Sequence, residues 1–552
     1  MGEFNQRGFI GGMNAILEDN YLPEDTYAFL QNGRIRYGGV VPNKKAVLVS
    51  EVPSGKKQGL VAAGSTLICF VSGFAYYRLD GQTTWNIIPG FAMDPLVERY
   101  ETALVPASNM NYKRTSGGSV QEDASVNNVL TSSTPQALVV QDGGYTQPHV
   151  IFPNGTARAC YTYADWSNTT NGIREYVPKG RQMLYFNGIL YIVSTDGTKI
   201  YRSVTGRPLD FMVNIDPSGN KLANEAEGGA VSTSHSVGYE EITCLAPLNA
   251  EVFMVGTRRE VVLVQPIRDI TIFGEPTFAN VARLQAGVVN SQSVIEVTGT
   301  GDTAFIDFEG IKSFNAVLQL KNEGNNSNFS LPVSPYFRGI VQDTDLVAAT
   351  DFDDYSLFSV STSSGFGILV FDNLLQKWVA FDQPFTGAVK QFATTYTSNE
   401  QKLYAITSSD EVYRLYDSTN DYERVTLRTR AVSPSSLRSE HKPIFARCVL
   451  TRGVEAGTLE VIPYVDGKRY NSRSKTLRSS LGGVSFPVIP PVGPDSTDQV
   501  DLISLNFPTL PLGWKFSNTL RWDNGATLTH LSWETEENPS LNSPQQKALS
   551  YT

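Results

Sequence analysis

The residues that could do chemistry in this chain are few and lie far apart. The sequence contains no phosphate-binding GxxxxGK[ST] loop, no HExxH pair and no CxxC pair. Because metal ligands and catalytic triads need characteristic groupings, we expect no metal site, no cofactor and no catalytic residues, and we interpret the cysteines as buried free thiols. The residues concerned are His149, His235, His441 and His530, with Cys69, Cys160, Cys244 and Cys448.

Two short fragments carry weaker chemical signals. The run Asp351-Phe352-Asp353-Asp354 offers carboxylates to a calcium ion, but it lacks the glycine and the distal glutamate of a calcium loop. We favour a solvated turn, which needs no metal. Residues 78–85, RLDGQTTW, contain the aspartate and tryptophan of a sialidase repeat turn, but with a different spacing and in one copy. The sequence therefore predicts that the chain is not an enzyme, and a propeller glycosidase is the last alternative.

The composition excludes further classes of protein. The 552 residues include 46 Gly, 29 Pro, 25 Tyr and 28 Phe but only 7 Met, a profile typical of a turn-rich β protein. The formal net charge of −10 argues against a protein that wraps nucleic acid with a basic surface. No stretch approaches 18 apolar residues, so we expect no membrane span. The first residues lack the basic and apolar segments of a secretory signal.

Pairs of short β-type runs joined by tight turns recur along the chain. Each run has about four to seven residues and is rich in Val, Ile, Tyr and Phe. The recurrence, every ~50 residues, is typical of β-propeller blades. We therefore predict an all-β fold with a propeller of six to eight blades, and stacked β-sandwiches are the alternative. The turn centres lie near residues 73, 142, 196, 257, 309, 364 and 410.

Changes in this rhythm suggest four parts of the chain. We expect an N-terminal arm and lead-in over 1–57, the propeller over 58–420, a C-terminal β-sandwich over 421–540 and a tail over 541–552. Three stretches without blade rhythm are interpreted as insertions in the propeller, and they lie near 101–135, 160–182 and 214–239. Within the arm, residues 22–34 are expected to form a short helix that ends at Gly33.

A recognisable series of motifs begins near the N-terminus. Gly11-Gly12-Met13-Asn14 is followed by Leu22-Pro23, by Asn32-Gly33-Arg34-Ile35-Arg36 and by Gly38-Gly39. Further along come Gly188-Ile189-Leu190-Tyr191-Ile192, Tyr201-Arg202-Ser203, Pro208-Leu209-Asp210-Phe211 and a blade turn at residues 304–311. In this order the motifs resemble those of the tail nozzle and tail-stabilisation (head-closure) proteins of short-tailed, podovirus-like bacteriophages. The resemblance covers most of residues 8–420.

The resemblance implies a structural protein of the virion, located in the phage tail and assembled in the host cytoplasm. Members of this family form a ring, usually a homohexamer, below the portal and its adaptor, and double-stranded DNA passes through the lumen during ejection. The implied partners are other copies of the chain, adaptor or portal-proximal proteins, and tail fibre or needle proteins. The alternative is a carbohydrate- or receptor-binding β-propeller.

Two groups of residues are candidates for assembly contacts. The segment 421–480 holds 12 Lys and Arg against 6 Asp and Glu, a net of +6, so it could face an acidic surface of the next subunit. Its candidate residues are Arg424, Arg428, Arg430 and Arg438. In the second insertion, Tyr163 and Trp166 could pack against another subunit or stack on a sugar ring.

Overall fold

The chain is described here by a computed structural model. The described residues are 2–6, 8–18, 21–106, 112–114, 120–122, 136–153, 155–160, 177–203, 205–206, 208–209, 211, 229–232, 240–266, 278–315, 329–337, 346–362, 365–397, 400–417, 421–433, 441–451, 456–478 and 500–537. Most of the three expected insertions and the expected tail lie outside them.

Nearly all regular structure in the described residues is β, arranged in many small antiparallel sheets. The first four sheets comprise β7 (Lys57–Ala63), β8 (Thr66–Val71), β9 (Phe74–Leu79) and β10 (Asn86–Ile87); β11 (Glu101–Pro106), β14 (Gln136–Gln141), β15 (His149–Ile151) and β16 (Ala157–Ala159); β17 (Gly180–Phe186), β18 (Ile189–Ser194), β19 (Lys199–Arg202) and β20 (Gly229–Ser232); and β21 (Ile242–Pro247), β22 (Phe253–Thr257), β23 (Val261–Pro266) and β24 (Phe278–Leu284).

Three further small sheets follow. They comprise β25 (Val294–Val297), β26 (Asp302–Asp307) and β27 (Gly310–Ser313); β28 (Ala348–Phe352), β29 (Tyr355–Thr362), β30 (Gly365–Asp372) and β31 (Lys377–Asp382); and β32 (Val389–Tyr396), β33 (Gln401–Thr407) and β34 (Val412–Leu415), to which β6 (Val47–Leu48) adds a strand. A separate hairpin of β12 (Tyr112–Arg114) and β13 (Val120–Glu122) lies within the expected insertion at 101–135. Short 3-10 helices are η3 (Ser291–Ser293) and η4 (Leu331–Phe337).

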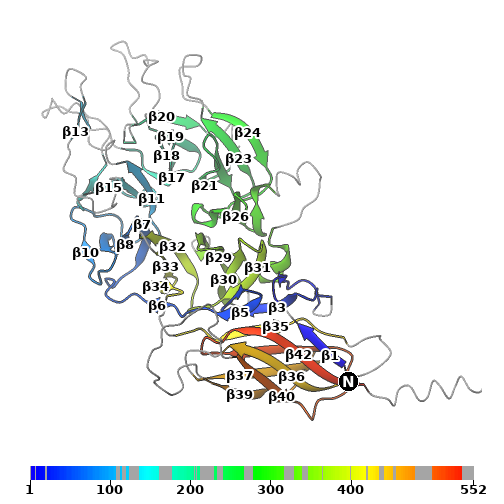
Figure 1. Cartoon of the computed structure of the whole chain (residues 1–552). Helices are drawn as coiled ribbons and strands as arrows, with labels where there is room; N and C mark the ends of the chain where they lie inside the picture. The colour runs from blue at the N-terminus through cyan, green and yellow to red at the C-terminus, as the bar shows by residue number, and fades with distance from the viewer. Residues whose placement is uncertain are drawn as a thin grey trace, which may run out of the picture.

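The first strands of the seven small sheets succeed one another around a common centre (Figure 1). Strand β7 lies against β11, β11 against β17, and β17 against β21. The series continues through η3 to β25, β28 and β32, and β32 lies against β7 again. The last sheet is completed by β6, which comes from the N-terminal part of the chain. Because β6 directly precedes β7 of the first sheet in the chain, its pairing with β34 links the last sheet to the first.

The seven expected hairpins are all confirmed. Each turn centre falls between the second and third strand of one small sheet, as in the pairs β8–β9 and β33–β34. Several turns need a positive φ, for example 48° at Ser72 and 89° at Gly73. Glycine adopts that conformation without a steric cost, which explains why glycines at these positions predicted the hairpin turns.

Two larger sheets combine strands from both ends of the chain. One has the order β4-β5-β42-β36-β40, with β1 also on β42; the other has the order β2-β3-β35-β41-β37-β38, with β39 also on β37. Their bounds are β1 (Gly2–Gln6), β2 (Gly12–Met13), β3 (Thr26–Gln31), β4 (Gly33–Arg36), β5 (Gly39–Pro42), β35 (Val425–Thr429), β36 (His441–Thr451), β37 (Gly457–Val465), β38 (Lys468–Arg469), β39 (Arg473–Leu477), β40 (Val500–Asn506), β41 (Phe516–Trp522) and β42 (Leu528–Glu537).

The N-terminal segment therefore differs from the expected lead-in. Its strands are hydrogen-bonded into the sheets of the C-terminal strands, for example β3 along β35 and β1 along β42. The expected helix over 22–34 is also wrong, because residues 26–31 form β3 and are mostly buried. Pairing with β35 on one side and β2 on the other satisfies the backbone groups of β3, and this gain outweighs a local preference for helix.

The apolar cores lie between the sheets. One large cluster joins the two larger sheets to the fifth, sixth and seventh small sheets, and includes Trp378, Trp522 and Trp533. All four cysteines are free and buried, as expected, and burial raises the pKa of Cys69 and of Cys448 to about 12. Among the described residues, no helix has the length and hydropathy needed to cross a membrane.

Candidate functional site

A buried carboxylate joins the N-terminal strands to the small sheets. Asp382, at the end of β31, is fully buried and forms an ion pair of 2.6 Å with Arg34 of β4. Its Oδ1 accepts a hydrogen bond from the backbone N–H of Asn32 at 3.1 Å. Its Oδ2 also accepts from the Asn43 amide at 3.1 Å and from the Tyr416 hydroxyl at 2.9 Å. Because both oxygens are satisfied, this charge is stable away from water.

The environment of Arg34 keeps it charged. Burial by itself lowers the pKa of Arg34, but Asp382 and Tyr416 outweigh this effect and raise the pKa above its ordinary value. The guanidinium also lies 4.9 Å from the ring centres of Tyr355 and Tyr416. Burial raises the pKa of both tyrosines, and Asp382 adds to the effect at Tyr416. We call this group of Asp382, Arg34, Asn32, Asn43 and Tyr416 the junction.

The glycine motif of the arm meets the same sheet. Gly12 has a φ of +81°, and a Cβ atom there would lie 2.7 Å from the carbonyl oxygen of Trp378 in β31. The hydroxyl of Tyr27 in β3 donates a hydrogen bond of 2.8 Å to the carbonyl of Val379. A side chain at Gly12 would separate these two elements, so the close approach requires glycine.

The acidic run that could have bound calcium is occupied by protein groups. Arg36 lies 3.6 Å from Asp353 and 3.3 Å from Asp354. Asp351 Oδ1 accepts hydrogen bonds of 3.0 Å from Ser356 and from the Asn373 amide. Across the described part of the chain, no group of three or more His, Cys, Asp or Glu side chains is arranged to hold a metal ion.

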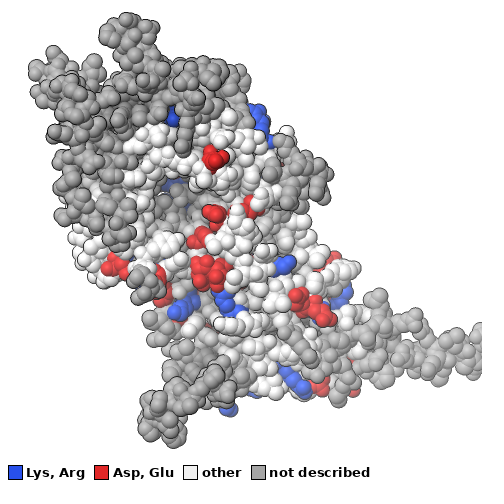
Figure 2. All heavy atoms as spheres, turned by 45° about the horizontal axis from the view of Figure 1, so that its top comes forward, with Lys and Arg blue, Asp and Glu red and all other residues white. Residues whose placement is uncertain are grey.

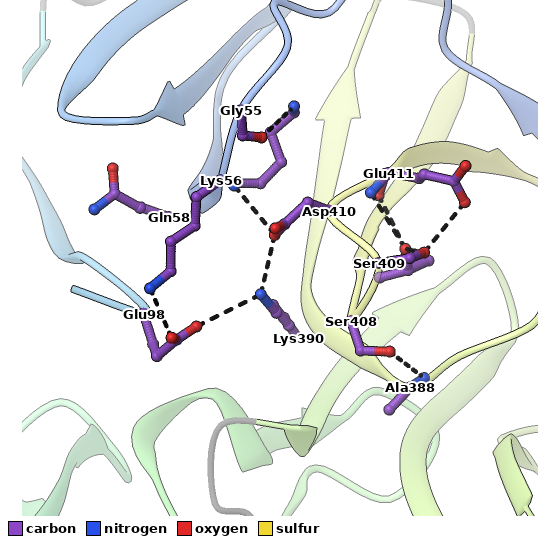
Figure 3. Close-up of polar contacts among 12 residues, drawn as sticks. Gly55, Lys56, Gln58, Glu98, Ala388, Lys390, Ser408, Ser409, Asp410 and Glu411 are labelled. Carbon is purple, nitrogen blue, oxygen red and sulfur yellow. Dashed lines mark hydrogen bonds and ion pairs between the residues drawn. The ribbon is translucent and has the colours of Figure 1, made fainter. Parts of the chain in front are cut away.

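A second polar network lies where the first and seventh small sheets meet (Figure 3). Glu98 lies 2.6 Å from Lys56 and 3.7 Å from Lys390. Lys390 also lies 3.0 Å from Asp410, which accepts a hydrogen bond of 3.1 Å from the backbone N–H of Lys57. Glu98 remains 56 % exposed, so water screens this network far more than it screens the junction. We call the side chains of Lys56, Glu98, Lys390 and Asp410 the axial network.

A cleft of about 480 Å³, which we call the axial cleft, adjoins the axial network. It combines three carboxylates, two guanidinium groups and an exposed aromatic ring at Tyr145. Inside it, Arg99 lies 3.2 Å from Glu101, and Arg181 is ion-paired with Glu241. Acidic side chains are also visible around a hollow in the ring of small sheets (Figure 2). The side chains of interest are Asp94, Glu98, Arg99, Glu101, Arg181 and Gln182.

The centre of the ring is spanned by a direct contact. The hydroxyl of Ser291 in η3 donates a hydrogen bond of 3.2 Å to Glu101 at the start of β11. These residues belong to the fifth and second sheets of the series, which lie on different sides of the centre. Nearby, Arg99 Nη1, Gln182 Oε1 and both amide atoms of Gln141 are buried without a hydrogen-bond partner in the protein. Such groups are satisfied by ordered water or by a ligand.

The structure places only some of the expected contact residues. Arg424 is exposed and lies 3.1 Å from Glu460 of β37, whereas the guanidinium of Arg428 lies 5.7 Å from the ring centre of Tyr464. Arg430 is half-buried, and its Nε has no hydrogen-bond partner. Arg424 immediately precedes β35, Arg428 lies in it, and Arg430 immediately follows it. Arg438, Tyr163 and Trp166 lie outside the described residues.

Sequence reasoning missed the axial cleft altogether. Its residues come from the 94–101 loop, the turn after β14 and the start of β17, with no motif linking them. The histidines are not brought together: His149 lies in β15, His441 in β36 and His530 in β42, and His235 is outside the described residues. The signal that could have indicated the cleft is the recurrence of charged residues just before the first strand of successive repeats.

Comparisons with known proteins assign no family. No family model matches the chain, and no curated protein matches it. Among solved structures, the fold is similar to a chain described as "Crystal Structure of Mitotic Checkpoint Complex", with 9 % sequence identity over 68 % of this chain and 95 % of that chain. The TM-score is 0.32, so this likeness carries no argument about function.

Proposed function

We propose that this chain is a structural protein of a phage tail that forms a ring-shaped nozzle or closure conduit for double-stranded DNA. In this proposal the seven small sheets are the blades of a β-propeller, and the two larger sheets are a β-sandwich built from both ends of the chain. The proposal also includes the virion location, the adaptor and fibre partners and the hexameric ring that the motif resemblance implies. It assigns the chain no enzymatic activity.

The observation that carries the proposal is the position of the motif residues. Gly12, Asn32 and Arg34 come from the motifs that resemble the nozzle proteins, and all three contact the sixth small sheet. A tail conduit transmits force between its parts as DNA moves through it, so a rigid attachment between the two parts is useful there. A motif set at such an attachment supports a structural role better than a catalytic one.

The contact at the centre of the small sheets supports a particular route for DNA. Ser291 and Glu101 meet across the ring, so the centre of a single chain has no room for a duplex at that level. The proposed conduit is therefore the lumen enclosed by several copies, with each copy contributing part of the wall. The net charge of −10 suits such a wall, because it does not retain phosphate groups.

Electron microscopy of the purified full chain at high concentration tests this proposal. We expect class averages of closed rings whose central opening is wide enough for a duplex. Rings should also form on the purified adaptor assembly of the phage that encodes the chain. Discs that remain separate at every concentration and in the presence of that adaptor would overturn the proposal.

The axial cleft favours a second candidate function, binding of a carbohydrate receptor. Its volume of about 480 Å³ falls in the range of small-molecule sites, and Tyr145 presents a ring that is 70 % exposed. A glycan array would test this candidate, with Tyr145→Ala as the control that should abolish binding. A glycosidase is less well supported, because ion pairs already engage Glu98 and Glu101.

A further inference from the structure

One edge of the seven-stranded sheet carries an unneutralised basic strand. Strands β38 and β39 pair with β37 at this edge, and residues 473–476 of β39 are exposed. Successive side chains of a strand point to opposite faces, so residues 473–476 of β39 are uncovered on both faces, whereas Leu477 is buried. Five exposed basic residues lie here, and within the described part of the chain none of them forms an ion pair: Lys468, Arg469, Arg473, Lys475 and Arg478. We call them the basic edge.

The opposite side of the same two sheets carries an acidic cleft of about 550 Å³. Its walls include Glu24 and Asp25, which lead into β3, and no ion pair to either carboxylate occurs among the described residues. Ile10 in the cleft is 51 % exposed, and Tyr37 beside it is fully exposed. In Figure 1, β39 and the N-terminal strand β1 lie toward opposite sides of this part of the molecule.

We propose that the basic edge of one copy docks against the acidic cleft of a second copy of this chain. This inference rests on the proposed ring assembly and identifies the two surfaces that would form it. Each copy carries both surfaces, so the contact is heterologous and repeats head to tail. The opposite charges orient the encounter, while Ile10 and Tyr37 supply apolar area at the contact.

A second copy fits these observations better than another partner does. An acidic protein or a DNA duplex would cover the basic edge, but it would leave the acidic cleft and its apolar side chains exposed. Basic residues on an edge strand can also serve to deter unwanted pairing between sheets, but that role accounts for the basic edge alone and not for the acidic cleft. Head-to-tail docking explains together the five basic side chains and, on the other side, the two carboxylates, none of which forms an ion pair among the described residues.

Charge reversal on the full chain tests the proposal. Arg473→Glu/Lys475→Glu reverses the basic edge, and Glu24→Lys/Asp25→Lys reverses the acidic cleft. Sedimentation velocity over a concentration series should show that each reversal raises the concentration for half-association by at least about tenfold. A variant that carries all four substitutions should recover association, because its two surfaces are again complementary. Salt should weaken association of the wild-type chain.

The matched control is Arg258→Glu/Arg259→Glu, which makes the same change in charge at an exposed turn of the fourth small sheet. It should associate as the wild type does, and circular dichroism should show that every variant is folded. The proposal would be overturned if the charge-reversed variants associate as the wild type does, or if the combined variant does not recover association. It would also be overturned if the wild-type chain never self-associates. Binding of a duplex DNA fragment by the basic edge, without self-association, would overturn it in favour of a polyanion partner.

Microscopy of the same samples separates this inference from the proposed function. Closed rings that survive both charge reversals would leave the conduit standing and overturn the docking surfaces. Open filaments that both reversals abolish would support the docking surfaces and overturn the conduit. A folded monomer under all conditions, alone and with the adaptor, would overturn both.

Discussion

The junction and the axial network are both built from ion pairs, but they differ in burial and in completeness. Asp382 is fully buried, and both of its oxygens accept hydrogen bonds or an ion pair. Glu98 is more than half exposed, and its neighbours include buried polar atoms without a protein partner. The junction carboxylate is saturated by protein groups, although Arg34, Asn43 and Tyr416 also line a cleft of about 220 Å³. The axial network, in contrast, lies beside buried polar atoms that keep capacity for water or a ligand.

Removing the buried carboxylate should have the largest effect. Asp382→Ala leaves Arg34, Asn43 and Tyr416 without their shared acceptor, so we expect a loss of about 3–5 kcal/mol in the free energy of unfolding. Urea denaturation followed by circular dichroism measures this loss. Asp354→Ala, which removes an exposed partner of Arg36 in the same region, is the control and should cost less than about 1 kcal/mol. Equal losses in the two variants would contradict the distinction.

The close approach at Gly12 gives the next largest expected effect. Gly12→Ala adds a Cβ atom 2.7 Å from the Trp378 carbonyl and forces a positive φ on alanine, so we expect a loss of about 2–4 kcal/mol. Gly38→Ala is a matched control, because Gly38 has a φ of +78° but open space around it. It should lose about 1 kcal/mol in the same denaturation experiment. If both variants lose the same amount, the contact with Trp378 is unimportant.

A pH titration probes a buried histidine of the second small sheet. Burial lowers the pKa of His149 below its ordinary value of 6.5, although a hydrogen bond with the Gln147 carbonyl opposes this effect. The unfolded chain therefore binds a proton more readily than the folded chain, and stability falls as the pH drops below 6.5. We expect a modest fall in the melting temperature between pH 7 and pH 5. The part due to this histidine should disappear in His149→Gln.

The axial network should give the smallest effect. Glu98→Gln weakens the ion pairs with Lys56 and Lys390, but the exposed carboxylate is screened by water, so we expect a loss of less than about 1 kcal/mol. The loss should shrink further in high salt, whereas the loss in Asp382→Ala should persist. Thermal melts at two salt concentrations measure both. A large, salt-independent loss at Glu98 would show that the two networks are alike.

The hairpins were predictable because their information is local. Ser72-Gly73, Asp196-Gly197 and Glu309-Gly310 sit in short turns between strands, and a positive φ favours particular residues wherever such a turn occurs. The partner of Arg34 was not predictable, because Asp382 lies 348 positions away along the chain. The axial cleft was missed for the same reason, since its side chains come from two successive sheets and from the loop that precedes β11.

By itself the sequence determined the all-β class, the seven hairpins and the burial of the free cysteines, because strand alternation, turn conformation and apolar composition act over a few residues. Only folding in three dimensions could place the arm at 1–57 among the C-terminal strands and turn residues 26–31 from an expected helix into a strand. Both placements depend on which sheet edges, formed by residues far away in the sequence, have unpaired backbone N–H and C=O groups. A strand adds to the edge where its own backbone groups and those of the edge can form hydrogen bonds.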